Sequence, residues 1–175
     1  MANFTLPGID DADAESVRSL LQERLVALID TALTLKHVHW NVVGPTFIGV
    51  HEMIDPQVVA VQGMADAVAE RIAAMGGSPN GLPGNLVKSR SWDDFPVDRA
   101  PVPEHLAALD VAYSGLIGDH RGAIEAAGKV DPVTEDLLIG QTGELEQFQW
   151  FVRAHLENAD GAIETAEADR KAAAS

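Results

Sequence analysis

Two histidines, two aspartates and a glutamate lie in one part of the chain at spacings that suit metal binding. They are His39, His51, Asp55, Asp66 and Glu70. His51 and Asp55 are four residues apart, as are Asp66 and Glu70, so on a helix each pair shares one face. Because the sequence contains no cysteine, a metal must be bound through imidazole and carboxylate groups, which suit hard or borderline metals.

The overall composition makes cations the expected partners. The chain has 175 residues, with 27 Asp and Glu against 12 Lys and Arg, and a formal charge of -15. The negative electrostatic field of such a charge repels nucleic acid and concentrates cations. A hydrophobic content of 46%, with no run of about 18 apolar residues, predicts a soluble globular protein without a signal peptide or membrane span. We expect a cytoplasmic location.

Two long amphipathic helices are predicted in the first half of the chain. The first runs from residue 13 to about residue 41, because apolar side chains recur there at three- and four-residue spacing. Its candidate N-caps are Asp10, Asp11 and Asp13. The second runs from about residue 47 to residue 75 and contains Pro56. Proline removes a helical hydrogen bond and crowds the preceding turn, which predicts either a kink near Glu52 or a restart capped by Asp55.

A long connection and two more helices are predicted in the second half. Residues 76–101 contain four prolines, and the segment SWDDFPVDR could form a short helix capped by Asp93 or Asp94. Helices from 103 to about 127 and from 132 to about 159 each have proline near their first turn. Four long helices with one long crossover predict an all-α fold, a ferritin-like four-helix bundle with a short extra helix in the crossover. The expected division is an N-terminal extension at 1–12, the bundle at 13–159 and a flexible tail at 160–175.

This bundle limits where the five side chains can meet. His39 ends the first helix on its apolar face. Asp55 and Asp66 are eleven residues apart, so about 16 Å of helix separates the two pairs and one metal ion cannot bridge them. None of the six histidines has a glutamate three residues before it, which excludes the usual intramolecular carboxylate site.

Two interpretations therefore remain open. Either two subunits share the site across a two-fold contact, or the five residues are core histidines and solvated carboxylates without a metal. The other histidines are predicted to be structural or surface residues: His37, His105, His120 and His155.

The ligand spacing and its surroundings resemble the Dps family, the DNA-binding proteins from starved cells. The motifs are KHVHWNVVGPTFIGVHEMID and ADAVAERIAAMGG, and the resemblance covers about residues 13 to 157, including SWDDFPVD and GELEQFQWFVRAHLE. It implies a dodecameric hollow shell with ferroxidase activity, which oxidises ferrous iron, preferentially with hydrogen peroxide, and stores the ferric mineral. This activity would protect the cell from oxidative damage.

The resemblance also implies roles for individual residues. A di-iron site would take Asp66 and Glu70 from one subunit and His39, His51 and Asp55 from the next. The resemblance assigns to Trp40 the role of the site tryptophan that intercepts radicals, with a core filler as the alternative. Candidates for an acidic three-fold pore are Asp119, Asp131 and Asp136, which are otherwise surface aspartates. Arg71 and Glu146 would form an ion pair at a subunit contact, or a weak surface bridge.

The two ends of the sequence predict weak or absent DNA binding. Shell proteins of this family that bind DNA resemble one another in having mobile basic tails. Here no Lys or Arg precedes Val17, and after Leu156 five acidic residues accompany only Arg170 and Lys171. The alternatives are a nucleoid-compacting DNA-binding shell with secondary iron chemistry, and a helical assembly protein that does not use its ligands.

Overall fold

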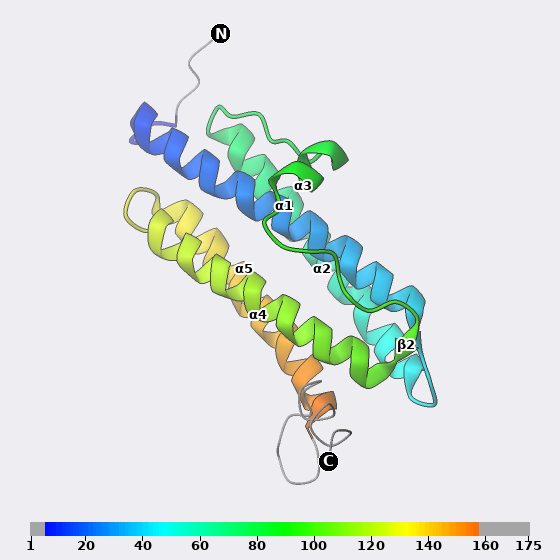
Figure 1. Ribbon diagram of the computed structural model, residues 1–175. Helices are drawn as coiled ribbons and strands as arrows, with labels where there is room; N and C mark the ends of the chain where they lie inside the picture. The colour runs from blue at the N-terminus through cyan, green and yellow to red at the C-terminus, as the bar shows by residue number, and fades with distance from the viewer. Residues whose placement is uncertain (1–5, 158–175) are drawn as a thin grey trace, which may run out of the picture.

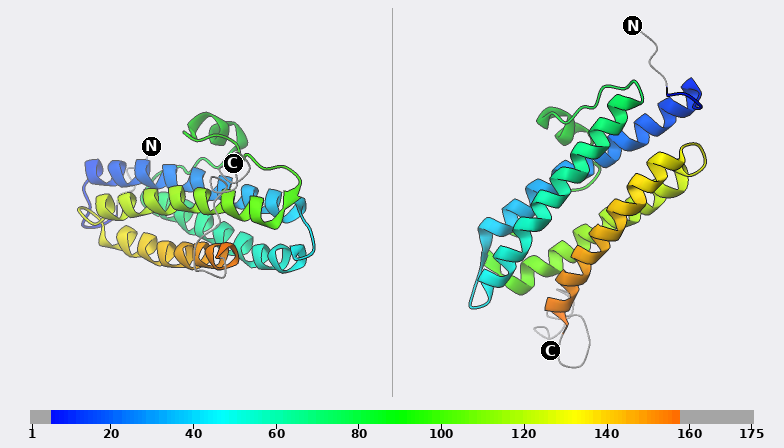
Figure 2. Two further views of the ribbon diagram at one scale, coloured as in Figure 1. Left: turned by 60° about the horizontal axis from the view of Figure 1, so that its bottom comes forward. Right: turned by 180° about the vertical axis from the view of Figure 1, so that it is seen from behind.

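The bundle is built from two helical hairpins that lie side by side (Figures 1 and 2). The computed structural model describes residues 6–157. The first hairpin pairs α1 (Asp11–Asn41) with α2 (Phe47–Ala74), and the second pairs α4 (Val102–Ala127) with α5 (Pro132–Leu156). A crossover containing the short α3 (Pro83–Ser89) joins them. The predicted all-α four-helix bundle with one long crossover is confirmed, and none of its helices is long and apolar enough to cross a membrane within residues 6–157.

The predicted helix ends agree with the structure to within a few residues. α1 begins two residues before the expected start, because Asp10 is its N-cap and accepts a hydrogen bond from the Asp13 amide at 2.9 Å. α5 begins at Pro132 and ends at Leu156, slightly before the expected end near residue 159. The proposed tail at 160–175 lies outside the described residues. Of the proposed extension at 1–12, residues 1–5 lie outside them, and residues 11 and 12 belong to α1.

Helix α2 continues through Pro56, so the predicted restart with Asp55 as cap is wrong. Proline lacks an amide hydrogen, which leaves the carbonyl of Glu52 without its helical donor. Glu52 and Pro56 both lie on the exposed side of the helix, where water can donate a hydrogen bond to the Glu52 carbonyl. Ile54 and Val58 are buried on the opposite side and hold the helix against the core. The kink near Glu52 stays a prediction.

The short extra helix lies earlier in the crossover than the sequence indicated. It begins at Pro83, a favourable first helical residue, and buries Leu86. The predicted segment SWDDFPVDR is not helical. Pro96 disfavours a helical conformation of the residue before it, and the Trp92 Nε1–H donates to Asp30 Oδ2 of α1 at 2.7 Å. Tertiary contacts to α1 thus replace the capping role proposed for Asp93 or Asp94.

A two-residue parallel ladder ties the α1–α2 turn to the end of the crossover. β1 (Val42–Val43) pairs with β2 (Ala100–Pro101), with Val42 opposite Ala100. The sequence analysis did not find these strands, because two residues carry no periodicity. The ladder directly follows His39 and the end of α1, so it fixes the chain where the first candidate ligand lies.

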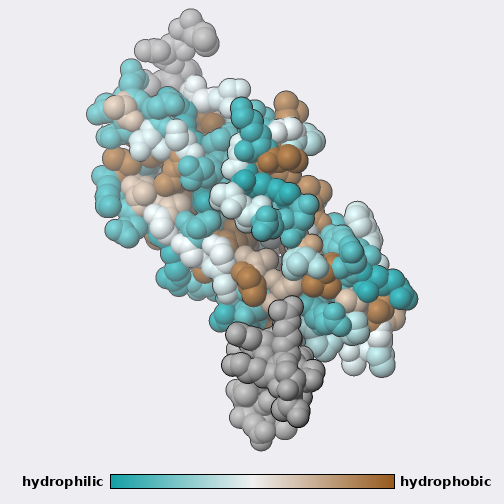
Figure 3. All heavy atoms as spheres, viewed as in Figure 1, coloured by the Kyte–Doolittle hydropathy of each residue, from teal (hydrophilic) through white to brown (hydrophobic). Residues whose placement is uncertain are grey.

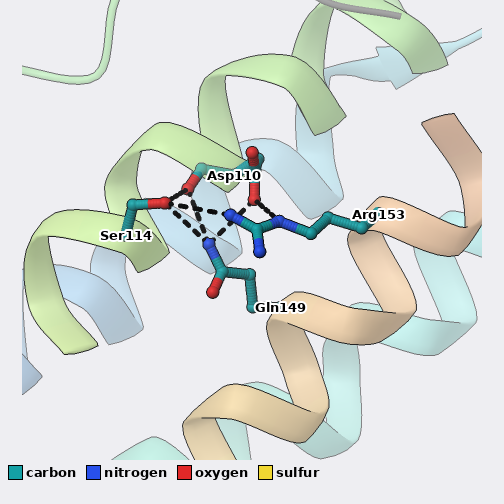
Figure 4. Close-up of polar contacts among 4 residues, drawn as sticks. All are labelled: Asp110, Ser114, Gln149 and Arg153. Atoms are coloured by element: carbon teal, nitrogen blue, oxygen red, sulfur yellow. Dashed lines mark hydrogen bonds and ion pairs between the residues drawn. The ribbon is translucent and has the colours of Figure 1, made fainter. Parts of the chain in front are cut away.

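A polar network holds α4 against α5 near the end of α5 (Figure 4). Arg153 donates from Nε to Asp110 Oδ1 at 2.6 Å. Gln149 Nε2 donates to the same carboxylate oxygen at 2.8 Å and contacts Ser114 Oγ at 2.7 Å. Two residues of each helix therefore join α4 to α5 in the second hairpin.

Candidate metal centre

The first half of the candidate site is a pair of stacked histidines. The end of α1 and the first turns of α2 bring the His39 and His51 rings to a centroid distance of 3.6 Å, with 23° between their planes. His39 Nδ1 lies 3.0 Å from the His51 carbonyl oxygen, and His51 Nδ1 lies 2.9 Å from the His39 carbonyl oxygen. A carbonyl only accepts, so each Nδ1 carries the hydrogen and each Nε2 keeps a lone pair for a metal.

Asp55 completes this half-site one helical turn after His51. Its Oδ1 lies 3.3 Å from His39 Nδ1 and 2.8 Å from Lys36 Nζ. The hydrogen bond from Lys36 lowers the pKa of Asp55, against a smaller opposing effect of desolvation. The carboxylate is therefore a stable anion that already has a cation beside it.

Lys36 is the residue of this cluster that the sequence analysis missed. It precedes His39 by three residues on α1, so helical spacing places the two on neighbouring parts of one face. That spacing was the available signal. The contact with Asp55 depends on how α1 packs on α2, which spacing along the chain does not reveal.

Trp40 is 71% exposed in the single chain, so the alternative of a core filler is wrong. Lys36 Nζ lies 5.9 Å from the centroid of its ring, within cation–π range. His39 beside it is buried. The half-site thus has a buried histidine side and an open side formed by Trp40 and Asp55.

Asp66 and Glu70 form the second half-site, farther along α2. Both are exposed, and within residues 6–157 neither forms a hydrogen bond or an ion pair through its side chain. Since α2 is continuous, about 16 Å of helix separates Asp66 from Asp55. No three His, Cys, Asp or Glu side chains of the described chain lie together in a way that could hold a metal ion. One subunit therefore presents two separate half-sites, and their completion by a second subunit stays a prediction.

The three pore candidates differ in their environment. Asp119 and Asp136 are exposed, and Asp119 Oδ2 lies 3.5 Å from Arg24 Nη2. Asp131 is only 2% exposed, so it is neither a pore-lining residue nor a surface aspartate of this chain. It caps α5, accepting from the Val133 amide, and it binds Arg71 Nη2 at 2.5 Å.

The buried Asp131 carboxylate stays ionised because of its donors. Burial alone would raise its pKa, but hydrogen bonds from Thr134 and Arg71 outweigh this and lower the pKa. The predicted Arg71–Glu146 pair does not form within the chain. Arg71 is bound to Asp131, while Glu146 accepts from Arg121 Nε at 3.0 Å.

The remaining histidines are structural or surface residues, as predicted. His105 and His120 are fully buried. His37 Nε2 lies 2.8 Å from the Val97 carbonyl of the crossover, and the exposed His155 contacts the Phe151 carbonyl at 2.7 Å. None of them lies in the His39–His51 cluster.

Comparison with known proteins identifies the family of this chain. The ferritin-like domain family matches residues 18–162. Over 163 residues the chain is 60% identical to the DNA protection during starvation protein of Mycolicibacterium smegmatis, covering 93% of this chain and 89% of that protein. The chain belongs to the Dps family. Both the predicted Dps resemblance and the ferritin-like fold are therefore confirmed.

Solved Dps structures have the same architecture. Mycobacterium smegmatis Dps superposes with a TM-score of 0.91 at 60% identity, covering 93% of this chain and 99% of that one. DpsA14 from Streptomyces coelicolor gives 0.91 at 62% identity, covering 93% and 96%. A relative with a different name is the fine tangled pili major subunit of Haemophilus ducreyi, 49% identical over 93% of this chain and 86% of its own length.

Proposed function

We propose that this Dps-family chain is a ferroxidase that oxidises ferrous iron with hydrogen peroxide and retains the ferric product inside a dodecameric shell. The observation that carries the proposal is the split ligand set on α2. His51 and Asp55 lie near one end of this helix, and Asp66 and Glu70 lie near the other. Two copies of α2 running antiparallel across a two-fold contact would form two complete sites.

Each half-site supplies a different part of the chemistry. Asp66 and Glu70 offer hard anionic oxygens, which favour ferric over ferrous iron and so ease the loss of an electron. His39 would bind the same ion through Nε2 from across the contact. His51 and Asp55 would form a weaker second position. Two ferrous ions each give one electron to hydrogen peroxide, whose O–O bond breaks, and two protons complete two water molecules.

The surface of the single chain supports assembly. Figure 3 shows hydrophobic patches among hydrophilic ones on one face of the molecule. Large apolar side chains are exposed on several helices, among them Trp40, Val59, Val111, Ile139 and Trp150. Scattered single residues would be ordinary, but this many on a small all-helical chain is typical of a protein that buries them against copies of itself.

We further propose that the protein acts in the cytoplasm and protects DNA by consuming ferrous iron and peroxide rather than by binding DNA tightly. The formal charge of -15 opposes contact with phosphate. The only basic pair of the tail, Arg170 and Lys171, lies outside the described residues. The competing proposal, a nucleoid-compacting shell, draws on the name of relatives such as the DNA protection during starvation protein, which refers to DNA.

The test is peroxide-driven iron oxidation in the absence of oxygen, followed by stopped-flow absorbance. We expect the double variant Asp66→Ala with Glu70→Ala to lose the fast phase by about a hundredfold or more, because one half-site loses both anionic ligands. The matched control is Glu125→Ala with Glu144→Ala, which removes two exposed carboxylates elsewhere. An unchanged fast phase in the first double variant would place oxidation away from the proposed site.

A further inference from the structure

Three aromatic side chains from three different elements meet near the end of α1. The Phe95 ring of the crossover lies 6.0 Å from the His37 ring of α1, with 67° between their planes. It also lies 6.0 Å from the buried His105 ring of α4, with only 6° between their planes. We call these three residues the aromatic clasp. The clasp joins the crossover to both hairpins, because α1 belongs to the first hairpin and α4 to the second.

Hydrogen bonds fix the His37 ring within the clasp. Its Nε2 lies 2.8 Å from the Val97 carbonyl oxygen of the crossover. A carbonyl only accepts, so Nε2 carries the hydrogen and Nδ1 is left as an acceptor. The Asn41 side-chain amide lies 3.4 Å from this Nδ1 and donates to the His37 carbonyl oxygen at 2.8 Å. These contacts tie the last turn of α1 to the crossover.

The same turn presents His39. The final carbonyl groups of a helix have no donor within the helix. Here the His39 carbonyl accepts from His51 Nδ1 at 2.9 Å. On the clasp side, burial lowers the pKa of His105, and the nearby carbonyls of Asn41 and Asp98 oppose this effect. The end of α1 therefore lies between a histidine of the half-site and a histidine of the clasp.

The β1–β2 ladder adds a second attachment after His39. Val42, three residues beyond His39, pairs with Ala100 of the crossover. His37, two residues before His39, is bonded to Val97 of the same segment. The chain is thus held by the crossover on both sides of the first candidate ligand.

We propose that the aromatic clasp positions His39 for the metal ion. The inference rests on the ferroxidase site proposed above. In that site Asp66 and Glu70 come from the other subunit, so they cannot set the direction of the His39 ring before the ion binds. The direction must be set within the subunit that carries His39, and loss of such supporting contacts typically weakens metal binding. His37 is a positioning residue, because it acts through the turn that carries His39.

Binding of Co²⁺ to the full-length protein, without oxygen or peroxide and followed by visible absorption, tests the role of His37. We expect His37→Leu to weaken Co²⁺ binding by about tenfold and to change the absorption bands that report the ligands. His37→Gln should restore both, because its side-chain N–H can donate to the Val97 carbonyl. The matched control is His155→Leu, which removes an exposed imidazole near the other end of the chain and should behave as the wild type.

The double variant Asp66→Ala with Glu70→Ala separates this inference from the proposed function. Wild-type Co²⁺ binding in that double variant would overturn the proposed site and the clasp with it. If the double variant loses Co²⁺ while His37→Leu keeps the wild-type affinity and spectrum, only the clasp is overturned. Equal losses in His37→Leu and His37→Gln would also overturn it. Phe95→Leu, which keeps an apolar side chain but removes the ring, should weaken binding in the same direction and serves if His37→Leu fails to fold.

Discussion

At the scale of single residues, Lys36 determines how available Asp55 is to a metal. Its ammonium group lies 2.8 Å from the carboxylate oxygen that a second metal ion would use. A metal ion at this position would be repelled by the Lys36 ammonium group, so Lys36 would weaken the second position. The ion pair is exposed, and its effect on affinity is correspondingly modest.

Lys36→Met should therefore tighten metal binding at the Asp55 position. We expect the dissociation constant for Zn²⁺, a redox-inert probe, to fall by about two- to fivefold, the range of a surface ion pair. Titration calorimetry would measure it, with Lys88→Met as a control for the loss of one exposed lysine. Weaker binding in Lys36→Met would mean that the lysine orients Asp55 for the metal instead of competing with it.

His120 should make the folded protein sensitive to mild acid. Its pKa falls from 6.5 to about 4 on folding, chiefly because of burial. Above pH 6.5 the ring is neutral in both states and contributes nothing. As the pH falls from 6.5 to about 4, only the unfolded chain gains the proton, so the free energy of unfolding decreases by about 3 kcal/mol per chain.

Urea unfolding at fixed protein concentration across this pH range would measure the effect. His120→Phe should remove most of the slope, and the exposed His155→Phe should retain it. Burial lowers the pKa of His105 as well, so a smaller slope of the same sign remains. Asp55 and Asp131 do not interfere, because their lowered pKa values shift their loss of stability below the ordinary value of 3.8. A wild-type slope in His120→Phe would contradict the assignment.

At the scale of elements, the Arg71–Asp131–Thr134 cluster joins the end of α2 to the start of α5. The ion pair between Arg71 and Asp131 is nearly buried, because the Arg71 side chain is 16% exposed and the Asp131 side chain 3%. Arg71 follows Glu70 directly. The cluster therefore holds in place the helical turn that presents the second half-site.

Asp131→Ala should be among the most damaging single substitutions in this chain. It leaves the largely buried guanidinium of Arg71 without its carboxylate partner and removes the N-cap of α5, so we expect a loss of about 3 kcal/mol. Asp131→Asn keeps a capping oxygen and should lose less. Asp136→Ala is the exposed control, with an effect of about 0.5 kcal/mol or less. Equal urea midpoints for the Ala variant and the wild type would show that the cluster contributes no net stability.

Elements were predictable where local chemistry decides them. The apolar periodicity of α1 and the capping aspartate before it are both properties of consecutive residues, and both proved correct. The position of α3 was wrong because contacts with Asp30 and the effect of Pro96 override the capping preference of Asp93 and Asp94. The ligand residues were selected by spacing alone, whereas Lys36 and the burial of Asp131 depend on how separate helices pack.

At the scale of the whole molecule, the split ligand set predicts that the proposed ferroxidase activity is a property of the assembly. A variant without His39 and His51, and a variant without Asp66 and Glu70, should each be inactive alone. Shells assembled from both should recover activity, because some two-fold contacts combine two intact half-sites. Each contact between the two different variants forms two sites. One site has all five ligands, and the other lacks the four substituted ligands.

Stopped-flow oxidation by mixed shells, with their composition verified by mass spectrometry, would measure the recovery. For equal and random mixing we expect about a quarter of the wild-type rate, since half of the contacts are mixed and each has one complete site of two. Shells mixed after assembly are the control. Absence of recovery in verified mixed shells would rule out sharing across the contact.

The uninterrupted course of α2 through Pro56 has a consequence for engineering. A continuous helix fixes both the separation and the angular phase of the two half-sites. One residue inserted between Asp55 and Asp66 would lengthen the helix between them by only about 1.5 Å but would turn one half-site by about 100° relative to the other. An insertion of a whole heptad would nearly restore the phase while moving the sites apart by about 10 Å. The chain can thus be redesigned for wider site spacing only in steps that respect the helical repeat.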